Sequence, residues 1–322
     1  MRSWDMTVTV LTPTYNRGDL LSRCYDSLCR QSNKDFEWIV VDDGSTDDTD
    51  KKVKAWMTGI VCIDDNTYSG HSVRGGFPIL YLKQPNGGKH RALNHGVTKA
   101  HGELTLILDS DDYLANDTIT IIHKVFMTMP TEAALGGIAA RKAHFDGRLI
   151  GRNYSWAVKD LSLLDYRYRQ NRKGDMCEVY LTKVMREYPF PEIEGEKFCP
   201  EALVCNRIAT RYQLRYIPDV VYHCEYLKDG LSSHITKIRM DSTVASMITY
   251  AELSQYDIPF IQRAKAAINY HRFALCRDRK RPVRGTDMNK PVTLPTFSRW
   301  WCWTKPLGWL MHRNDLKIVD KA

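Results

Sequence analysis

The stretch Leu104-Thr105-Leu106-Ile107-Leu108-Asp109-Ser110-Asp111-Asp112 passes from an apolar, partly β-branched run to three carboxylates within four positions. The run is typical of a buried strand, and the acidic residues stand at its carboxyl end. Carboxylates this close repel one another unless a cation or strong hydrogen bonds compensate them. Oxygen ligands suit Mg²⁺ or Mn²⁺, particularly beside a substrate phosphate. A solvated acidic turn is the alternative for the carboxylates alone.

Earlier strands are predicted to end in polar residues as well. Short β-rich runs cover residues 7–11, 38–41 and 79–82, and helical periodicity follows the first and the third of them. This alternation predicts an α/β fold with a parallel sheet, in which ligands bind beyond the carboxyl ends of the strands. The candidate ligand groups at the four strand ends are Thr12 to Arg17, Asp42 and Asp43, Asn86 to Lys89, and Asp109 to Asp112.

The remaining periodicity is weaker. Residues 57–77 are rich in Gly, Ser, Asn and Asp, so they are predicted to form a long loop or insertion. After about residue 141 the chain reads as irregular up to residue 175. A helix is expected over 201–212 and a strand over 216–222.

Composition excludes several classes of protein. The chain has 322 residues, 43% of them hydrophobic and 26% charged, which is ordinary for a folded protein. It has no apolar run of transmembrane length and no signal-peptide core at its start. Its nine cysteines include no CxxC pair, which argues against a zinc site and favours a reducing cytoplasm.

The net charge of +8 is concentrated in the C-terminal part. Residues 259–322 hold 14 Lys and Arg against 4 Asp and Glu, a balance of +10, so the rest of the chain carries −2. The same part holds Trp300, Trp301, Trp303 and Trp309. Trp with Lys and Arg is typical of a bilayer interface, although Pro295 and Pro306 argue against one long amphipathic helix. Burial of these tryptophans or a subunit contact is the alternative, and no nucleic-acid-binding signature accompanies the charge.

Four motifs in order, VTVLTPTYNR, WIVVDDGSTDDT, NGGKHRALNHG and LILDSDD, resemble glycosyltransferase family 2. The resemblance is strong over residues 1–125 and continues through EGEKFCPE and YLKDGLS to about residue 235. It implies a Rossmann-like A-type glycosyltransferase fold with a mixed, mainly parallel sheet. The catalytic domain would span 1–235, with a nucleotide-sugar-binding half (1–125) and an acceptor half (126–235). Residues 236–322 would form a basic, Trp-rich helical extension.

The resemblance also assigns roles. Thr12, Pro13, Tyr15, Arg17 and Asp43 would hold the nucleoside, where a Tyr ring can stack on a base and a carboxylate can accept from its N–H. Asn86, Gly88 and Lys89 would pass close to the ribose and diphosphate, and Asp111 would lie near the sugar. Asp112 would bind Mn²⁺ or Mg²⁺, with Asp109 and His223 as further candidates. The cation would neutralise the leaving diphosphate.

An inverting transfer needs a general base within reach of the acceptor hydroxyl. Glu196 falls where the family usually shows an acidic pair, but the second member here is Lys197. Glu196 is therefore the predicted base, with Glu194 and Glu201 as substitutes. A surface acidic turn is the alternative.

The expected protein is a glycosyltransferase facing the cytoplasm, soluble or peripheral on the inner face of the membrane. It would move a sugar, most simply from a UDP-sugar, to a glycan or lipid-linked acceptor in bacterial surface-polysaccharide synthesis. The alternatives are a sugar-phosphate nucleotidyltransferase, which usually has a Gly-rich loop after its first strand, and a non-catalytic glycan- or membrane-binding protein.

Overall fold

The computed structural model describes residues 8–130, 134–152, 157–225, 234–278, 280 and 282–319, with side chains as far as residue 317. The chain forms two compact units. Unit 1 comprises Met1–Ser162, Arg172–Glu187 and Arg211–Glu225. Unit 2 comprises Leu163–Asn171, Tyr188–Thr210 and Tyr226–Ala322. The YLKDGLS motif at 226–232 lies outside the described residues.

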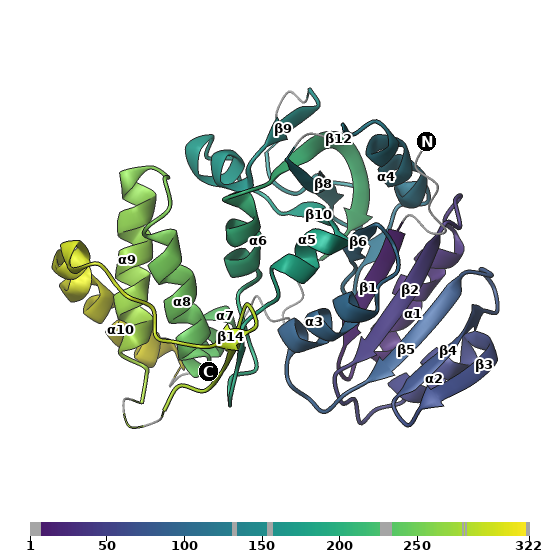
Figure 1. Ribbon diagram of the computed structural model, residues 1–322, viewed down its shortest axis with the longest axis horizontal. Coiled ribbons are helices and arrows are strands. Elements are labelled where there is room, and N and C mark those ends of the chain that lie inside the picture. Colours follow the sequence, from purple (N-terminus) through teal and green to yellow (C-terminus); the bar gives the residue numbers. More distant parts are fainter. Residues whose placement is uncertain are drawn as a thin grey trace. The chain divides into compact units, whose positions relative to one another are not determined.

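Unit 1 is built on an 11-stranded mixed sheet within the described residues (Figure 1). Its main path runs β3-β4-β5-β2-β1-β6-β10-β8-β12-β7, and β9 pairs with β12. The strands are β1 (Val8–Thr14), β2 (Phe36–Asp42), β3 (Met57–Asp64), β4 (Thr67–Ser72), β5 (Pro78–Lys83), β6 (Leu104–Ile107), β7 (Tyr113–Leu114), β8 (Leu135–Ala143), β9 (Lys159–Leu161), β10 (Met176–Leu181) and β12 (Gln213–His223). The helices are α1 (Gly18–Cys29), α2 (Thr49–Ala55), α3 (Lys89–Lys99), α4 (Thr118–Met127) and α5 (Thr182–Glu187).

The centre of this sheet confirms the predicted architecture. Strands β5, β2, β1 and β6 are neighbours, and all three pairings among them are parallel. Every residue of β1 and β2 is buried, as expected for strands covered on both faces. Helix α1 buries the predicted face, with Leu21, Cys24, Tyr25 and Leu28 inside. The four carboxyl ends therefore lie at one edge of the sheet.

Two local predictions were wrong. Residues 57–77 are not a loop: β3 and β4 form an antiparallel hairpin that extends the sheet beyond β5. Nearly all of β3 is exposed on both faces, so it lacks the apolar alternation that marks a half-buried strand. The first strand is also longer than predicted and includes Pro13, which pairs with Val41 of β2. Its pairing with β6 stops at Leu11, so Pro13 has no ladder partner on that side.

Beyond residue 127 the sheet becomes mainly antiparallel. The strand β8 pairs antiparallel with β10 and parallel with β12. It ends just after residue 141, and the region from there to residue 175 that was expected to be irregular contains the short strand β9 and a helical turn at Asp165–Arg169. The expected strand at 216–222 is confirmed as part of β12. This strand matters for the site because it carries Tyr222 and His223 at its carboxyl end.

Unit 2 is mainly helical, as the sequence predicted for the C-terminal part. Its helices are the π-helix η1 (Asp165–Arg169), α6 (Glu201–Ala209), α7 (Ile235–Asp241), α8 (Thr243–Leu253), α9 (Phe260–Ala274), the 3-10 helix η2 (Arg299–Thr304) and α10 (Lys305–Val319). A small sheet pairs β11 (Glu192–Ile193) with β13 (Gly285–Asp287), and β13 with β14 (Lys290–Pro291). The chain thus returns from α9 to pair with the segment before α6.

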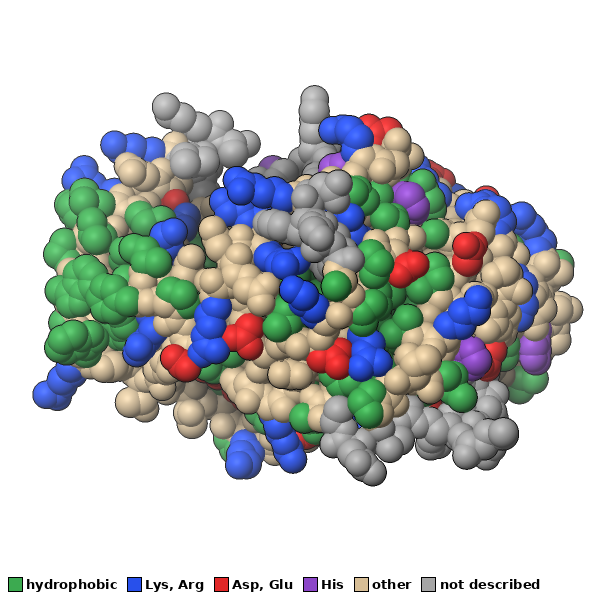
Figure 2. All heavy atoms as spheres, turned by 90° about the horizontal axis from the view of Figure 1, so that it is seen from above, with side chains coloured by type: hydrophobic (Ala, Val, Ile, Leu, Met, Phe, Trp, Pro, Cys, Tyr) green, Lys and Arg blue, Asp and Glu red, His purple; other side chains and the backbone are tan. Residues whose placement is uncertain are grey.

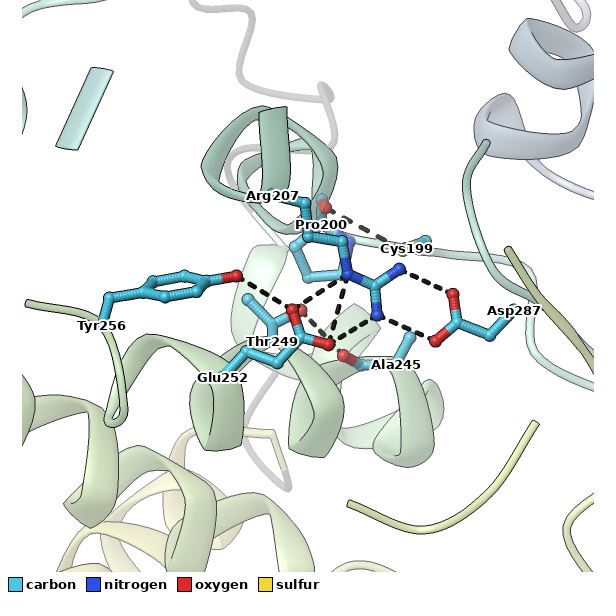
Figure 3. Close-up of polar contacts among 8 residues, drawn as sticks. All are labelled: Cys199, Pro200, Arg207, Ala245, Thr249, Glu252, Tyr256 and Asp287. Carbon is cyan, nitrogen blue, oxygen red and sulfur yellow. Dashed lines mark hydrogen bonds and ion pairs between the residues drawn. The ribbon is translucent and has the colours of Figure 1, made fainter. Parts of the chain in front are cut away.

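A buried arginine ties three elements of unit 2 together (Figure 3). Arg207 of α6 donates from Nη1 and Nη2 to Asp287 of β13, at 2.6 and 2.8 Å. It also donates to Glu252 of α8, at 2.9 Å from Nε and 2.6 Å from Nη2. The Tyr256 hydroxyl donates to the same Glu252 at 3.0 Å. Burial lowers the pKa of Arg207, but its two carboxylate partners outweigh burial and leave that pKa above its usual range.

The expected C-terminal tryptophans divide into two groups. Trp301 is buried beside Ala264 and Ala267 of α9, whereas Trp300, Trp303 and Trp309 are exposed. Pro306 does not break the helix, because it lies in the first turn of α10, where backbone N–H groups need no intrahelical partner.

Within the described residues, the helices are too short or too polar to cross a bilayer.

Candidate active site

Loops from the carboxyl ends of β1, β2, β5 and β6 contact one another in unit 1. Arg17, after β1, lies 3.8 Å from the Asp111 carboxylate, after β6. Lys89, after β5, forms an ion pair with Asp109 at 2.5 Å. Asp43, after β2, binds the loop that follows β5. The predicted convergence of the four strand ends is therefore confirmed.

Tyr222 of β12 forms hydrogen bonds with the acidic loop, residues 109–112. The Tyr222 hydroxyl donates to Asp112 Oδ2 at 2.8 Å and accepts the N–H of Asp109 at 3.0 Å. Tyr222 is fully buried, and the Lys142 ammonium lies 4.2 Å from the centre of its ring. Neither Tyr222 nor Lys142 was singled out in the sequence, because a Tyr and a Lys within strands have no local signal for such a role.

The three carboxylates respond differently to their surroundings. Burial, followed by the charges of Asp109 and Asp111, raises the pKa of Asp112 to about 7, although the hydrogen bond from Tyr222 acts to lower it. Burial and the Asp109 charge also raise the pKa of Asp111. Burial opposes ionisation of Asp109 as well, but Lys89 and Lys142 outweigh it and hold that pKa below its usual value. The positive groups around Asp111 and Asp112 therefore do not fully compensate the negative charge of the two carboxylates.

This excess of negative charge fits a divalent cation in its donor chemistry. Asp111 and Asp112 offer hard carboxylate oxygens, and both ionise reluctantly without a further positive charge. In the part of the chain that the structure describes, no three His, Cys, Asp or Glu side chains gather as a ready-made metal site. The remaining ligands would have to come from a bound phosphate or from water.

His223 is placed beside aromatic groups. Its ring stacks on Tyr113 with centroids 4.6 Å apart, and its Nδ1 lies 3.2 Å from the carbonyl oxygen of His144. These contacts fix the ring without using a carboxylate of the acidic loop. Its role as a metal ligand stays a prediction.

Asp43 organises the loop after β5. Its carboxylate accepts the N–H groups of Gly87 and Gly88, at 2.9 and 2.7 Å. It also accepts from the side chains of Gln84 and Asn86, at 2.7 and 3.2 Å. Asp43 is buried, and these four bonds use the capacity of one carboxylate. In this structure Asp43 therefore shapes the Asn86–Lys89 turn, and its direct contact with a base stays a prediction.

The predicted nucleoside-binding residues after β1 differ in accessibility. Thr12 is completely buried, and its hydroxyl accepts from the Trp38 indole at 2.9 Å, so it belongs to the core. Pro13 is also buried. Tyr15 is 47% exposed and Arg17 is partly exposed. Of these four, Tyr15 and Arg17 present side chains that a ligand can contact.

The candidate bases belong to unit 2. Glu196 is buried, and its carboxylate accepts the N–H of Val244 at 2.7 Å and of Ala245 at 3.0 Å. These are amides of the first turn of α8, so Glu196 caps that helix. Glu194 and Glu201 are exposed. Glu201 is the first residue of α6, directly after Pro200.

Solved structures share this fold. The structure of Staphylococcus aureus TarS 1–349 in complex with UDP-GlcNAc is similar with a TM-score of 0.59 and 19% sequence identity, over 85% of this chain and 74% of that one. A mannosyltransferase from Pyrobaculum calidifontis, in complex with GDP-Man and Mn²⁺, has a TM-score of 0.52 and 20% identity, over 85% of this chain and 77% of that one. The fold is that of the A-type glycosyltransferases, as the sequence predicted.

Sequence comparison agrees. The profile of glycosyl transferase family 2 matches residues 9–186, more than half of the chain. Glycosyltransferase GlyG of Streptococcus pneumoniae is 30% identical over 228 residues, which cover 67% of this chain and 69% of that protein. The chain belongs to glycosyl transferase family 2. Glycosyltransferase GlyA of the same species is 32% identical over 159 residues, 48% of this chain but only 20% of GlyA. The chain thus matches a minor part of some longer relatives.

Proposed function

We propose that this protein transfers a sugar from a nucleoside-diphosphate sugar, with UDP as the preferred nucleotide, to a hydroxyl of a glycan or lipid-linked acceptor. The convergence of Arg17, Asp43, Lys89 and the acidic loop at one sheet edge carries this proposal. Membership of glycosyl transferase family 2 supports it, as does a structural neighbour solved with UDP-GlcNAc. Family membership also argues against the nucleotidyltransferase alternative.

The chain's own residues suit a nucleotide diphosphate. Tyr15 offers an exposed ring on which a base can stack. Arg17 and Lys89 supply cations, and Gly87 and Gly88 allow close backbone approach. Both cations are held next to carboxylates, so an incoming diphosphate would have to compete with Asp111 and Asp109 for them.

Asp111 and Asp112 would hold Mn²⁺ or Mg²⁺. When bound, the cation supplies charge neutralisation for the diphosphate as it leaves. The protein holds Asp112 in place through the Tyr222 hydroxyl, and Lys89 and Lys142 keep Asp109 ionised and compensate its negative charge. This arrangement reserves Asp111 and Asp112, rather than Asp109, for the cation.

The reaction would invert the anomeric centre. The acceptor oxygen forms a bond to the anomeric carbon while the bond from that carbon to the diphosphate oxygen breaks. The acceptor's proton passes to a carboxylate, and the nucleoside diphosphate leaves with the electron pair of the broken bond. The predicted base, Glu196, has both oxygens occupied by amides of α8. We therefore favour Glu201, its exposed substitute, for this proton.

Relatives suggest the acceptor class. A poly(ribitol-phosphate) β-glucosyltransferase of Bacillus spizizenii is 32% identical over 119 residues, and a hyaluronan synthase of Pasteurella multocida is 32% identical over 149 residues. Both proteins are bacterial and both names refer to a polymer, so we propose bacterial surface-polysaccharide synthesis as the setting. A lipid-linked acceptor would be presented at a membrane surface, and the proposal includes peripheral association with the cytoplasmic face.

The proposal is tested by thermal shift with a panel of nucleotides and nucleotide sugars, with and without Mn²⁺. A specific donor raises the melting temperature by mass action. UDP-sugars with Mn²⁺ should give the largest shift, and a response confined to other nucleotides would reject the UDP assignment. If no nucleotide shifts the melting temperature under any condition, the transferase proposal fails.

The base is tested with two glutamine variants. Glu201→Gln should keep the melting temperature and the UDP-dependent shift while losing sugar transfer, because only the proton acceptor is removed. Glu196→Gln is the matched control, since it replaces one helix-capping acceptor with an N–H donor. It should lower the melting temperature and leave transfer by the folded protein intact. The reverse pattern would restore Glu196 as the base.

A further inference from the structure

Apart from the buried Trp301, the segment η2–α10 of unit 2 has mainly small and polar residues inside and large apolar residues outside. Thr304, Gly308 and Asp315 are buried against the rest of the unit. At Gly308 a Cβ atom would lie 2.7 Å from Cβ of His271 in α9, so the two helices approach closely at a glycine. Asp315 forms a bidentate ion pair with Arg272 of α9, at 2.5 and 2.7 Å. A surface helix ordinarily has the opposite arrangement.

The outward side of this segment is apolar. Trp300, Trp303, Leu307 and Leu310 follow one another at helical spacing, and their exposures are 71%, 51%, 44% and 50%. Phe260, at the start of α9, stacks on Trp303 with centroids 6.5 Å apart and is itself exposed. Figure 2 shows hydrophobic side chains gathered at the left-hand end of the molecule, over α9 and α10.

We call this surface the aromatic face. It consists of Phe260, Trp300, Trp303, Leu307, Trp309 and Leu310. Such a concentration of exposed Trp, Phe and Leu is unusual on a free surface and marks an interaction site. Aromatic residues of this kind are enriched where one end of the ring is apolar and the other is wet.

Cations outnumber acidic residues in the elements that carry the aromatic face. Over α9 and residues 294–317 the sequence has seven Lys and Arg and a single acidic residue, Asp315. That one carboxylate is already paired with Arg272 inside the unit. The Arg313 guanidinium lies 4.8 Å from the centre of the Trp309 ring, so cation and aromatic group share the surface. The binding partner of the aromatic face should therefore carry negative charge together with an apolar layer.

We propose that the aromatic face docks on an anionic phospholipid bilayer, with its aromatic rings at the headgroup level and its lysines and arginines against lipid phosphates. This inference deepens the membrane association in the proposed function by naming the surface that performs it. A second copy of the chain is a poorer occupant, because a symmetric contact would bring like charges together. The docked surface would keep unit 2 beside a lipid-linked acceptor.

The test is flotation of the full chain with vesicles of phosphatidylcholine alone or of phosphatidylcholine mixed with phosphatidylglycerol, in the absence of any donor. We expect binding to the anionic vesicles that weakens with salt. The triple variant Trp300→Ser, Trp303→Ser, Leu310→Ser should bind at least about tenfold more weakly, since each side chain leaves the interface. These residues are exposed, so the melting temperature should change little.

Two further variants test whether vesicle binding depends on the positive charges and whether it is specific to the aromatic face. The combined change Lys305→Gln, Arg313→Gln and Lys317→Gln should cost about fivefold per residue on anionic vesicles. The matched control Ile60→Ser, Val61→Ser and Ile63→Ser removes exposed apolar side chains from β3 in unit 1 and should leave binding unchanged.

Three outcomes would overturn the inference. They are absence of vesicle binding, undiminished binding of the aromatic-face variant, and a dimer in solution that this variant dissociates. Transfer measured on a soluble acceptor is independent of flotation. A protein that transfers sugar without binding vesicles would refute only the docking surface, and one that binds vesicles without any nucleotide response would refute only the transferase.

Discussion

Replacing Asp112 with asparagine is expected to stabilise the folded protein at pH 8 while abolishing metal-stimulated transfer. The pKa of Asp112 is about 7 in the fold instead of the ordinary 3.8, because burial and two neighbouring carboxylates disfavour its charge. Each pKa unit corresponds to about 1.36 kcal/mol, so ionised Asp112 costs the fold at most about 4 kcal/mol. Asparagine keeps an oxygen that can accept the Tyr222 hydroxyl, and it carries no charge.

The sign of the pH dependence follows from the raised pKa. Below pH 3.8 Asp112 is protonated in both the folded and the unfolded chain and adds no cost. As the pH rises from 3.8 to 7, Asp112 is ionised in the unfolded chain but still protonated in the folded one, so the folded state loses relative stability, and the loss levels off above pH 7. The free-energy advantage of Asp112→Asn should therefore be small at pH 4 and reach about 2 to 4 kcal/mol at pH 8.

Asp109→Asn is the matched control, because it lies three residues away in the same loop. Lys89 and Lys142 hold the pKa of Asp109 below its usual value. Removing its charge leaves those cations without their carboxylate, so this variant should be less stable than the wild type at pH 8. The two substitutions remove the same charge from one loop and should shift stability in opposite directions.

The assay is urea unfolding of the three proteins at several pH values, without metal or nucleotide, followed by transfer measured with Mn²⁺. An Asp112→Asn protein that is no more stable than the wild type at pH 8, or whose advantage does not grow with pH, would refute the electrostatic reasoning. Undiminished Mn²⁺-stimulated transfer by this variant would refute the metal assignment.

Three further outcomes are expected. Tyr222→Phe should raise the Mn²⁺ concentration for half-maximal transfer about tenfold, because the hydroxyl that orients Asp112 is lost; titration of transfer against Mn²⁺ checks this. Arg207→Met should cost up to about 3 to 5 kcal/mol in urea unfolding, since two partly buried carboxylates lose their buried cation. Burial lowers the pKa of His90 to about 4, so the wild type should lose up to about 3 kcal/mol relative to His90→Gln as the pH falls from about 6.5 to 4; paired unfolding curves at both pH values measure it.

Much of unit 1 was predictable because its signals are local. The strands around Val10, Val40 and Leu106 are mainly apolar, β-branched runs, which is how strands buried on both faces appear in sequence. Polar residues directly after such runs must lie at one sheet edge when the strands are parallel. The ion pairs of Arg17 with Asp111 and of Lys89 with Asp109 confirm that expectation.

The β3–β4 hairpin and the partners of individual side chains were not predictable in the same way. The strand β3 is exposed almost throughout and β4 is only partly buried, so nothing selects a clear apolar alternation in the hairpin. Asp43 and Glu196 were assigned roles from their places in motifs. Their hydrogen bonds to Gly88 and to Val244 depend on segments 45 and 48 residues away.

The sequence by itself determined the class of fold and the strand ends that meet. It also determined the kinds of ligand that the carboxylates of the acidic loop and the side chains of Arg17 and Lys89 can bind. These properties depend on the periodicity of side chains along a strand or helix, which is a local matter. Only the tertiary structure decided that Tyr222 and Lys142 support the acidic loop, that Glu196 caps a helix, and that Trp300, Trp303 and Trp309 face outward while Trp301 is buried. Burial and hydrogen-bond partners depend on which distant segments pack together, and the charge that a carboxylate can carry depends on them in turn.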